Sequence, residues 1–161
     1  MSAESQFSVS RASTQDSAGI LECLHRAFEP YRLDYTREGF LDTVLTPETL
    51  AQRLQAMAIF VARDASGVIV GTIGCNRAHA DEGHIRGMAV LDAWQGRGVA
   101  QQLLDTAESE LKTLGCRRVT LDTTAPLQRA ISFYKRNGYQ ATGKVGDFFG
   151  MPLFEYARNL R

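Results

Sequence analysis

Residues 94–104 read WQGRGVAQQLL and place two glycines and an arginine directly before an apolar helical pattern. That pattern continues along one helix face through Ala100, Leu103, Leu104, Ala107, Leu111 and Leu114. Glycine at a helix start loses backbone entropy, so another requirement must favour it there. Because the first N–H groups of a helix lack intrahelical acceptors and carry partial positive charge, the stretch predicts an anion-binding helix start.

The segments on either side of this stretch have strand patterns. Residues 83–90 precede the helix and residues 117–124 follow it. A strand–helix–strand crossover pairs its two strands in parallel. Gly115 suits the C-terminal end of the helix, and Glu108 and Lys112 are spaced as an i,i+4 ion pair on its surface.

The rest of the chain predicts hairpins and helices around that unit. Strands are expected at 7–11, 59–63, 68–75, 139–145 and 151–159, with a polar loop at 76–82. Helices are expected at 14–28, 47–57 and 126–137, whereas residues 29–45 show no regular pattern. We therefore predict one α/β (α+β) domain over residues 1–161, with its core at about 7–156. Its sheet is mixed and mostly antiparallel, with one parallel strand–helix–strand unit and about four flanking helices.

Composition excludes several function classes. Lysine plus arginine equals aspartate plus glutamate, 18 each, so no basic excess favours nucleic acid or an anionic membrane. The N-terminus has no apolar signal region, and no apolar run reaches the length of a membrane span. The three cysteines, Cys23, Cys75 and Cys116, lie in apolar patterns without metal-ligand spacing, so we expect buried thiols, no metal and a cytoplasmic location.

Two other phosphate-binding motifs fit poorly. No GxxxxGK[ST] string occurs in the chain. Gly96 and Gly98 begin a G-x-G-x-x-G fingerprint, but Gln101 stands at its third glycine and repeated βαβ units are absent.

Gln-x-x-Gly-x-Ala, formed by Gln95, Gly98 and Ala100, instead resembles the signature of the GNAT superfamily of acyl-CoA-dependent N-acetyltransferases. A second string, A-x-x-F-Y-x-x-x-G-Y, is similar to another signature of that family; its residues are Ala130, Phe133, Tyr134, Gly138 and Tyr139. The resemblance covers residues 7–156 and is strongest over 84–139.

The resemblance implies acetyl-CoA as co-substrate, with its pyrophosphate at the helix start and its pantetheine amides paired with the strand that precedes it. An N–H of that strand would stabilise the oxyanion. The implied cofactor-binding residues are Met88, Ala89, Val90, Gln95, Gly96, Arg97, Gly98, Val99, Ala100 and Tyr134. The Met88 and Val90 side chains are expected in the core, and the Arg97 side chain contacts phosphate or is solvated.

Acetyl transfer to an amine benefits from a general base and a general acid. The resemblance makes Tyr134 the acid that protonates the leaving thiolate, the alternative being a core tyrosine. Histidine titrates near neutral pH, and His84 is the candidate base, the alternative being a structural histidine. Weaker candidate bases are Glu82, Glu22 and Glu155, and His79 is expected to be solvated. Leu127 replaces a small polar residue of the family pattern, which removes one expected cofactor contact.

The resemblance also places acceptor-binding segments at 29–45 and 146–151. Tyr31, Tyr35, Phe148 and Phe149 are the candidate acceptor contacts, although the same aromatics could pack a surface loop. The sequence predicts an N-acetyltransferase that acts on a small-molecule or protein amine in a ternary complex. The alternative is a non-catalytic CoA-binding regulatory module of the same fold. A homodimer through the edge of the final strand, residues 153–157, is a further expectation.

Overall fold

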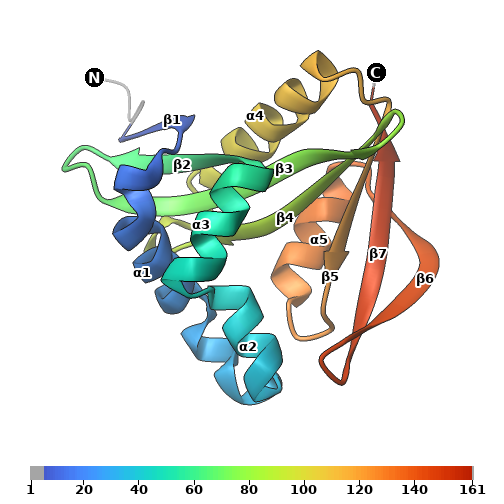
Figure 1. Ribbon diagram of the computed structural model, residues 1–161, viewed down its shortest axis with the longest axis horizontal. Helices are drawn as coiled ribbons and strands as arrows, with labels where there is room; N and C mark the ends of the chain where they lie inside the picture. Colours follow the sequence, from blue (N-terminus) through green and yellow to red (C-terminus); the bar gives the residue numbers. More distant parts are fainter. Residues whose placement is uncertain (1–5, 161) are drawn as a thin grey trace.

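The computed structural model describes residues 6–160, in which a seven-stranded sheet carries helices on both faces (Figure 1). The strands are β1 (Phe7–Arg11), β2 (Ala58–Asp64), β3 (Ile69–His79), β4 (Glu82–Val90), β5 (Arg118–Thr123), β6 (Gln140–Phe148) and β7 (Met151–Asn159). Their order is β1-β2-β3-β4-β5-β7-β6, and within these residues β4 and β5 form the one parallel pair. The predicted mixed, mostly antiparallel sheet is confirmed.

Five α-helices flank this sheet: α1 (Ser17–Phe28), α2 (Arg37–Val44), α3 (Pro47–Ala56), α4 (Val99–Thr113) and α5 (Gln128–Arg136). Helices α1, α2 and α3 lie on one face and α4 lies on the other (Figure 1). The end of α5 meets the start of α4, where Gln101 Nε2 lies 2.9 Å from Asn137 Oδ1. The glycine-rich stretch 95–98 therefore lies beside α5.

Helix α2 is the element that the sequence pattern did not predict. Residues 29–45, expected to be irregular, form a short 3₁₀ segment (Glu29–Asp34) and then α2. Thr36 caps α2 by accepting a hydrogen bond from the Gly39 N–H, 3.1 Å away. Gly39 interrupts the helical signal because a Cβ there would lie 2.9 Å from Thr36 Oγ1 and 3.3 Å from the Phe148 ring. Close packing therefore requires glycine at position 39, although glycine has a low helix propensity.

Strand β3 is longer than its apolar pattern indicated. The strand was expected to end at residue 75, but pairing with β4 continues to His79, opposite Glu82. Arg77, Ala78 and His79 are exposed because this end of the hairpin extends beyond the core. The predicted loop 76–82 was therefore wrong, and the turn is confined to Ala80 and Asp81.

The last strand does not form a sheet edge. Strand β7 pairs with β5 on one side and with β6 on the other, so the expected free edge at residues 153–157 was wrong. The edge on this side of the sheet is β6, which is exposed along most of its length. A second copy that paired with this side would have to use β6.

All three cysteines are buried free thiols. Burial raises the pKa of Cys23 and of Cys75 to about 12, and it also raises the pKa of Cys116. Because the thiolate is the reactive form, these thiols are inert core residues.

A bulge in β4 opens the centre of the sheet. Parallel pairing with β5 ends at Ile85 opposite Leu121, although β4 continues to Val90. Where β4 pairs with β3, the three residues 72–74 of β3 lie opposite the four residues 86–89 of β4. Strand β4 therefore carries one extra residue there. Gly87 adopts the left-handed region at this point (φ +69°). Among residues 6–160, the edge of β4 that faces β5 therefore has no neighbouring strand beyond Ile85.

Candidate functional site

The start of α4 is a cradle of unpaired N–H groups. Gly96 (φ +75°) and Gly98 (φ +86°) both have left-handed backbones, which explains why glycine is used there. The N–H of Gln102 bonds to the Gly98 carbonyl. Within residues 6–160, the N–H groups of residues 96–101 have no backbone acceptor. A Cβ on either glycine would meet nothing within 4 Å, so open space lies in front of these groups. This geometry suits an anion.

A cavity of about 470 Å³, here called the α5 cavity, lies between this cradle, the end of β4 and α5. It contains eight of the ten predicted cofactor-binding residues, namely Met88, Ala89, Val90, Gln95, Gly96, Gly98, Ala100 and Tyr134. The Met88 and Val90 side chains pack against the core as expected, and they also line this cavity. Gln101, Arg129, Arg136 and Asn137 complete its polar lining; the sequence reasoning did not select them.

Two predicted residues, Arg97 and Val99, do not line the α5 cavity. The guanidinium of Arg97 lies 4.0 Å from the centre of the Trp94 ring and also bonds to Gln6. Val99 is 1% exposed and packs on β3, where a Cβ on Gly71 would lie 2.9 Å from its Cγ1. Of these two residues only the backbone N–H groups belong to the cradle, and a contact between the Arg97 side chain and phosphate stays a prediction.

Gln95 leaves a polar atom unpartnered in the cavity wall. Its Nε2 donates to the Val90 carbonyl at 3.4 Å. Its Oε1 is buried and has no donor among the described residues. Buried acceptors in folded proteins are normally satisfied, so this oxygen suits a ligand that brings an N–H or O–H group.

Tyr134 joins α5 to β4 inside the same cavity. The residue is 7% exposed, and its hydroxyl donates to Met88 Sδ at 3.4 Å. Burial raises the pKa of Tyr134, so the phenol keeps its proton at neutral pH. The thioether sulfur is a weak acceptor. The hydroxyl proton of Tyr134 is therefore not engaged by a strong acceptor within the protein.

A second cavity, of about 330 Å³ and here called the α2 cavity, lies on the side of the sheet that carries α2 and α3. Leu127 lines both cavities, so they adjoin at this residue. Leu127 precedes α5 and makes no side-chain capping bond among the described residues. Its apolar side chain lies where the two cavities meet, and the loss of a cofactor contact at this position stays a prediction.

The four predicted acceptor contacts lie in different places. Tyr35 and Phe148 line the α2 cavity, and Tyr35 Oη lies 2.8 Å from Thr124 Oγ1. Tyr31 lines the α5 cavity instead. Phe149 is 49% exposed, packs edge-on against Phe148 and is outside both linings. The Phe149 backbone is left-handed (φ +51°), and its contact with the acceptor stays a prediction.

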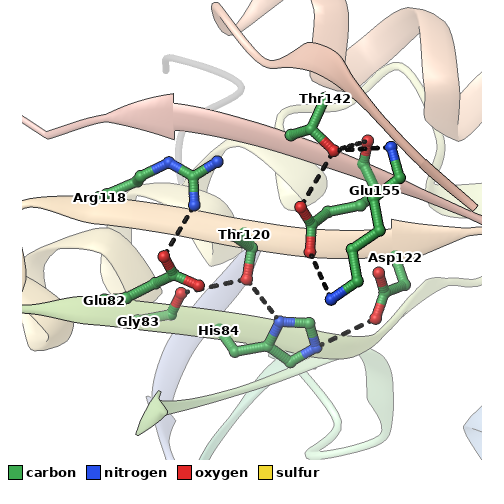
Figure 2. Close-up of polar contacts among 9 residues, drawn as sticks. Glu82, Gly83, His84, Arg118, Thr120, Asp122, Thr142 and Glu155 are labelled. Carbon is green, nitrogen blue, oxygen red and sulfur yellow. Dashed lines mark hydrogen bonds and ion pairs between the residues drawn. The ribbon is translucent and has the colours of Figure 1, made fainter. Parts of the chain in front are cut away.

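His84 lines the α2 cavity and sits in a polar network with β5 (Figure 2). Its Nδ1 lies 2.8 Å from Thr120 Oγ1, and its Nε2 lies 3.6 Å from Asp122 Oδ2. Thr120 Oγ1 in turn donates to the Gly83 carbonyl at 3.5 Å. With that donation, Thr120 accepts the Nδ1 proton, and the lone pair of the imidazole lies on Nε2.

Burial has the largest effect on the pKa values of His84 and Asp122. It lowers the pKa of His84 below its ordinary value, although the negative charge of Asp122 acts to raise it. Burial also raises the pKa of Asp122, again opposed by its partner. A histidine with a lowered pKa is neutral at pH 7, which is the form that accepts a proton.

The weaker candidate bases are not part of the α2 cavity lining. Glu82 accepts from Arg118 at 2.7 Å, and Glu155 accepts from Thr142 at 3.0 Å and lies 3.9 Å from Lys144 (Figure 2). His79 is exposed at the end of β3.

Sequence reasoning missed three charged residues of the α2 cavity, Arg53, Arg86 and Asp122. Arg86 had one available signal, since it stands two positions after His84 on β4 and therefore faces the same way. Asp122 and Arg53 become neighbours of His84 only through sheet pairing and helix docking.

Residues 6–160 contain neither a metal-binding cluster nor a membrane-spanning helix. In that part of the chain, histidine, cysteine, aspartate and glutamate form no group able to hold a metal ion. None of its helices combines the length and apolar character needed to cross a bilayer.

The family model described as acetyltransferase (GNAT) family matches residues 20–139. An N-alpha-acetyltransferase, MAK3, of Arabidopsis thaliana is 29% identical over 93 residues, which are 55% of this chain and 49% of that protein. An aminoglycoside N(6')-acetyltransferase type 1 of Stenotrophomonas maltophilia is 29% identical over 104 residues, which are 60% of this chain and 67% of that protein. The chain thus spans about half to two thirds of these relatives. PaiA N-acetyltransferase from Thermoplasma acidophilum, solved in complex with coenzyme A, has the same fold, with a TM-score of 0.78 at 19% identity over 99% of this chain and 100% of that chain.

Proposed function

The chain belongs to the acetyltransferase (GNAT) family, and on that premise we propose that it transfers an acetyl group from acetyl-CoA to a primary amine by direct attack in a ternary complex. One observation carries the proposal: a cavity that begins at unpaired helix N–H groups ends at the protonated hydroxyl of Tyr134. The names of the relatives support an amine acceptor, because each describes acetylation at nitrogen.

The residues of the α5 cavity fit coenzyme A. The N–H groups of residues 96–101 suit its pyrophosphate. The unpaired edge of β4 and the orphaned Oε1 of Gln95 suit the amide groups of its pantetheine arm. When bound, acetyl-CoA supplies the acetyl group as a thioester. The residues that hold it would be Gln95, Gly96, Gly98 and Ala100 at the cradle and residues 88–90 along β4.

His84 would receive the proton of the attacking amine. A free alkylamine keeps its proton up to a pKa of about 10, so at neutral pH a base assists its loss. Nε2 of His84 carries the lone pair in the arrangement described, and Asp122 lies 3.6 Å from it. The carboxylate would stabilise the imidazolium that forms when Nε2 takes up the proton.

Tyr134 would supply a proton on the other side of the reaction. Its buried phenol can give the proton on Oη to the departing sulfur as the carbon–sulfur bond breaks and the new carbon–nitrogen bond forms. The ammonium form of the acceptor first passes one proton to solvent by way of His84 and becomes the free amine. The second proton, lost from nitrogen as the amide forms, is then held on His84, and the thiol carries the proton from Tyr134. Exchange with solvent after product release restores both side chains.

Two measurements on the purified protein test this proposal. Calorimetric titration with acetyl-CoA should show saturable binding, and a thiol-release assay over a broad amine panel should show acetyl-CoA-dependent turnover. Saturable binding without thiol release would favour the non-catalytic CoA-binding module. No binding at millimolar acetyl-CoA would overturn both functions.

A further inference from the structure

The α2 cavity carries two cations beside the candidate base. Arg53, from α3, and Arg86, from β4, both line it. The same two arginines, with Asp42 and His84, also line an adjoining cavity of about 460 Å³ next to α3. The guanidinium groups therefore stand at the wall shared by two open spaces, where a ligand could reach them from either side.

Asp42 is the acid of the cavity wall that lies close to both arginines. Arg86 Nη2 lies 3.6 Å from Asp42 Oδ2. Arg53 forms no ion pair or hydrogen bond with the other residues among 6–160, although Asp42 lies close enough to influence it. Burial, followed by the charge of Arg86, lowers the pKa of Arg53 to about 10. A half-buried guanidinium without an acceptor is costly, and an anionic group would relieve that cost.

Arg53 also lies close to the bulge of β4. A Cβ on Gly87 would lie 3.3 Å from Arg53 Nη1, so the guanidinium packs against the backbone of that glycine. Gly87 directly precedes Met88, whose sulfur accepts from the hydroxyl of Tyr134. The unpaired cation is thus positioned next to the strand segment where the proposed transfer takes place.

The opposite charge is present in the same cavity. Asp122 and His84 line it from β5 and β4, and the pair lies 3.6 Å apart. An amine that gives its proton to His84 would occupy this end. A molecule that carries an amine and an anionic group could then satisfy both ends of the cavity at once.

We propose that the acceptor is an amine that also carries a carboxylate, held by Arg53 and Arg86 while its nitrogen faces His84. This inference rests on the proposed acetyl transfer and adds the chemical class of the acceptor. A carboxylate suits this site because the planar guanidinium can donate two parallel hydrogen bonds to its two oxygens. A free amino acid and a peptide whose first residue is acidic both provide this chemistry.

Thiol release measured on matched acceptors tests the proposal. Free amino acids are compared with their carboxamides and with the corresponding decarboxylated amines, and dipeptides beginning with Asp or Glu are compared with those beginning with Asn or Gln. We expect kcat/KM to be about tenfold or more higher for at least one carboxylate series than for its neutral counterpart. Equal or better turnover of the neutral amines would overturn the inference and leave acetyl transfer intact.

Substitution of Arg53 tests whether the preference for carboxylate acceptors depends on the α2 cavity. Arg53→Gln should raise KM for the preferred carboxylate about tenfold and lower, by about the same factor, the ratio of kcat/KM for that carboxylate to kcat/KM for the neutral counterpart. Arg53→Lys, which keeps the charge without the planar fork, should retain part of the preference. Arg26→Gln, at an exposed position on α1, is the matched control and should change neither value. Equal losses for both acceptor classes in Arg53→Gln would contradict the inference.

A binding measurement tests the carboxylate site even if none of the acceptors is acetylated. Protein saturated with coenzyme A is titrated calorimetrically with the same free amino acids and acidic dipeptides. Binding that Arg53→Gln weakens about tenfold supports the inference. If coenzyme A binds and no carboxylate binds at millimolar concentration, the carboxylate site is wrong; if coenzyme A itself does not bind, the proposed function fails.

Discussion

The hydroxyl of Tyr134 donates a hydrogen bond to the sulfur of Met88, 3.4 Å away, and so links α5 to the bulged end of β4. Both residues line the α5 cavity. Because a thioether is a weak acceptor, the bond orients the phenol without holding its proton tightly. A core tyrosine whose only role was packing would be expected to have a stronger acceptor for its buried hydroxyl.

Tyr134→Phe should therefore lower turnover while sparing cofactor binding. The substitution keeps the ring and its edge-on contact with Tyr139 at 5.9 Å, and it removes only the proton donor. General acid catalysis typically contributes about 100-fold or more, so kcat should fall by about that factor. Calorimetric titration should give an acetyl-CoA affinity within a few-fold of the wild-type value. Unchanged kcat across pH would remove the acid role from this residue.

The pair formed by His84 and Asp122 leads to a pH-dependent prediction. Neutral His84 is the competent base, so kcat/KM should rise with pH as His84 loses its proton. Because burial lowers the pKa of His84, the midpoint of that rise should lie below the ordinary histidine value of about 6.5. Asp122 raises the pKa of His84, so Asp122→Asn should move the midpoint to still lower pH.

The pH–rate profiles of three proteins check this prediction. His84→Gln should abolish the acid limb and lower kcat/KM about 100-fold. Arg86, Glu155 and Glu82 also act on His84 and remain in place in Asp122→Asn, so the shift reports the loss of one carboxylate. A midpoint that moves to higher pH in Asp122→Asn would contradict the assignment.

The cradle glycines allow a comparison with a matched control. Gly98 (φ +86°) and Gly67 (φ +85°) both have positive φ, in the left-handed region, and a Cβ on either would meet nothing within 4 Å. Gly67 lies in the hairpin loop between β2 and β3, outside the α5 cavity lining. Alanine at either position should cost about 1 kcal/mol of stability through backbone strain.

Only Gly98→Ala should also impair cofactor binding. Its Cβ and the strained turn disturb the N–H groups that face the anion, which should weaken coenzyme A about tenfold. Denaturant unfolding and calorimetric titration measure the two effects separately. Equal coenzyme A affinity in the two variants would place the pyrophosphate away from the cradle.

Local signals made several elements predictable from sequence. Helix α3 begins at Pro47, where the predicted helix 47–57 begins, and Thr46 caps it by accepting from the Thr49 N–H at 3.2 Å. Gly115 adopts a left-handed backbone after α4, as its position indicated. These features depend on contacts within a few residues, which a single sequence displays directly.

Features that depend on distant contacts were not predictable in the same way. Asp122 reaches His84 because β4 and β5 pair in parallel, with His84 opposite Thr120, and no local pattern contains that register. Arg53 reads as a polar residue on the exposed face of a helix until α3 docks on the sheet. The order of β7 and β6, which places β7 inside, is likewise a property of the assembled sheet.

Glu108 is buried, although its spacing to Lys112 is typical of a residue on the helix surface. Its spacing to Lys112 predicted an exposed ion pair, but Glu108 is 8% exposed and accepts from Tyr139 Oη at 2.7 Å and from Arg158 Nη1 at 3.2 Å. The predicted pair was wrong because α4 turns this side chain toward β7 and toward Tyr139, which lies between α5 and β6. The carboxylate instead joins three elements in a buried network.

Arg158→Met should therefore destabilise the protein strongly. It leaves the Glu108 carboxylate buried without its cation, which typically costs about 3–5 kcal/mol. The matched control is Arg11→Met, since Arg11 pairs with Glu110 at 3.9 Å with 61% of its side chain exposed, and loss of such a pair costs about 1 kcal/mol or less. Adding Glu108→Gln to Arg158→Met removes the unpaired charge and should recover part of the loss. Urea unfolding of the three variants and the wild type measures these differences. Similar losses of stability for Arg158→Met and Arg11→Met would contradict a stabilising role for the buried network.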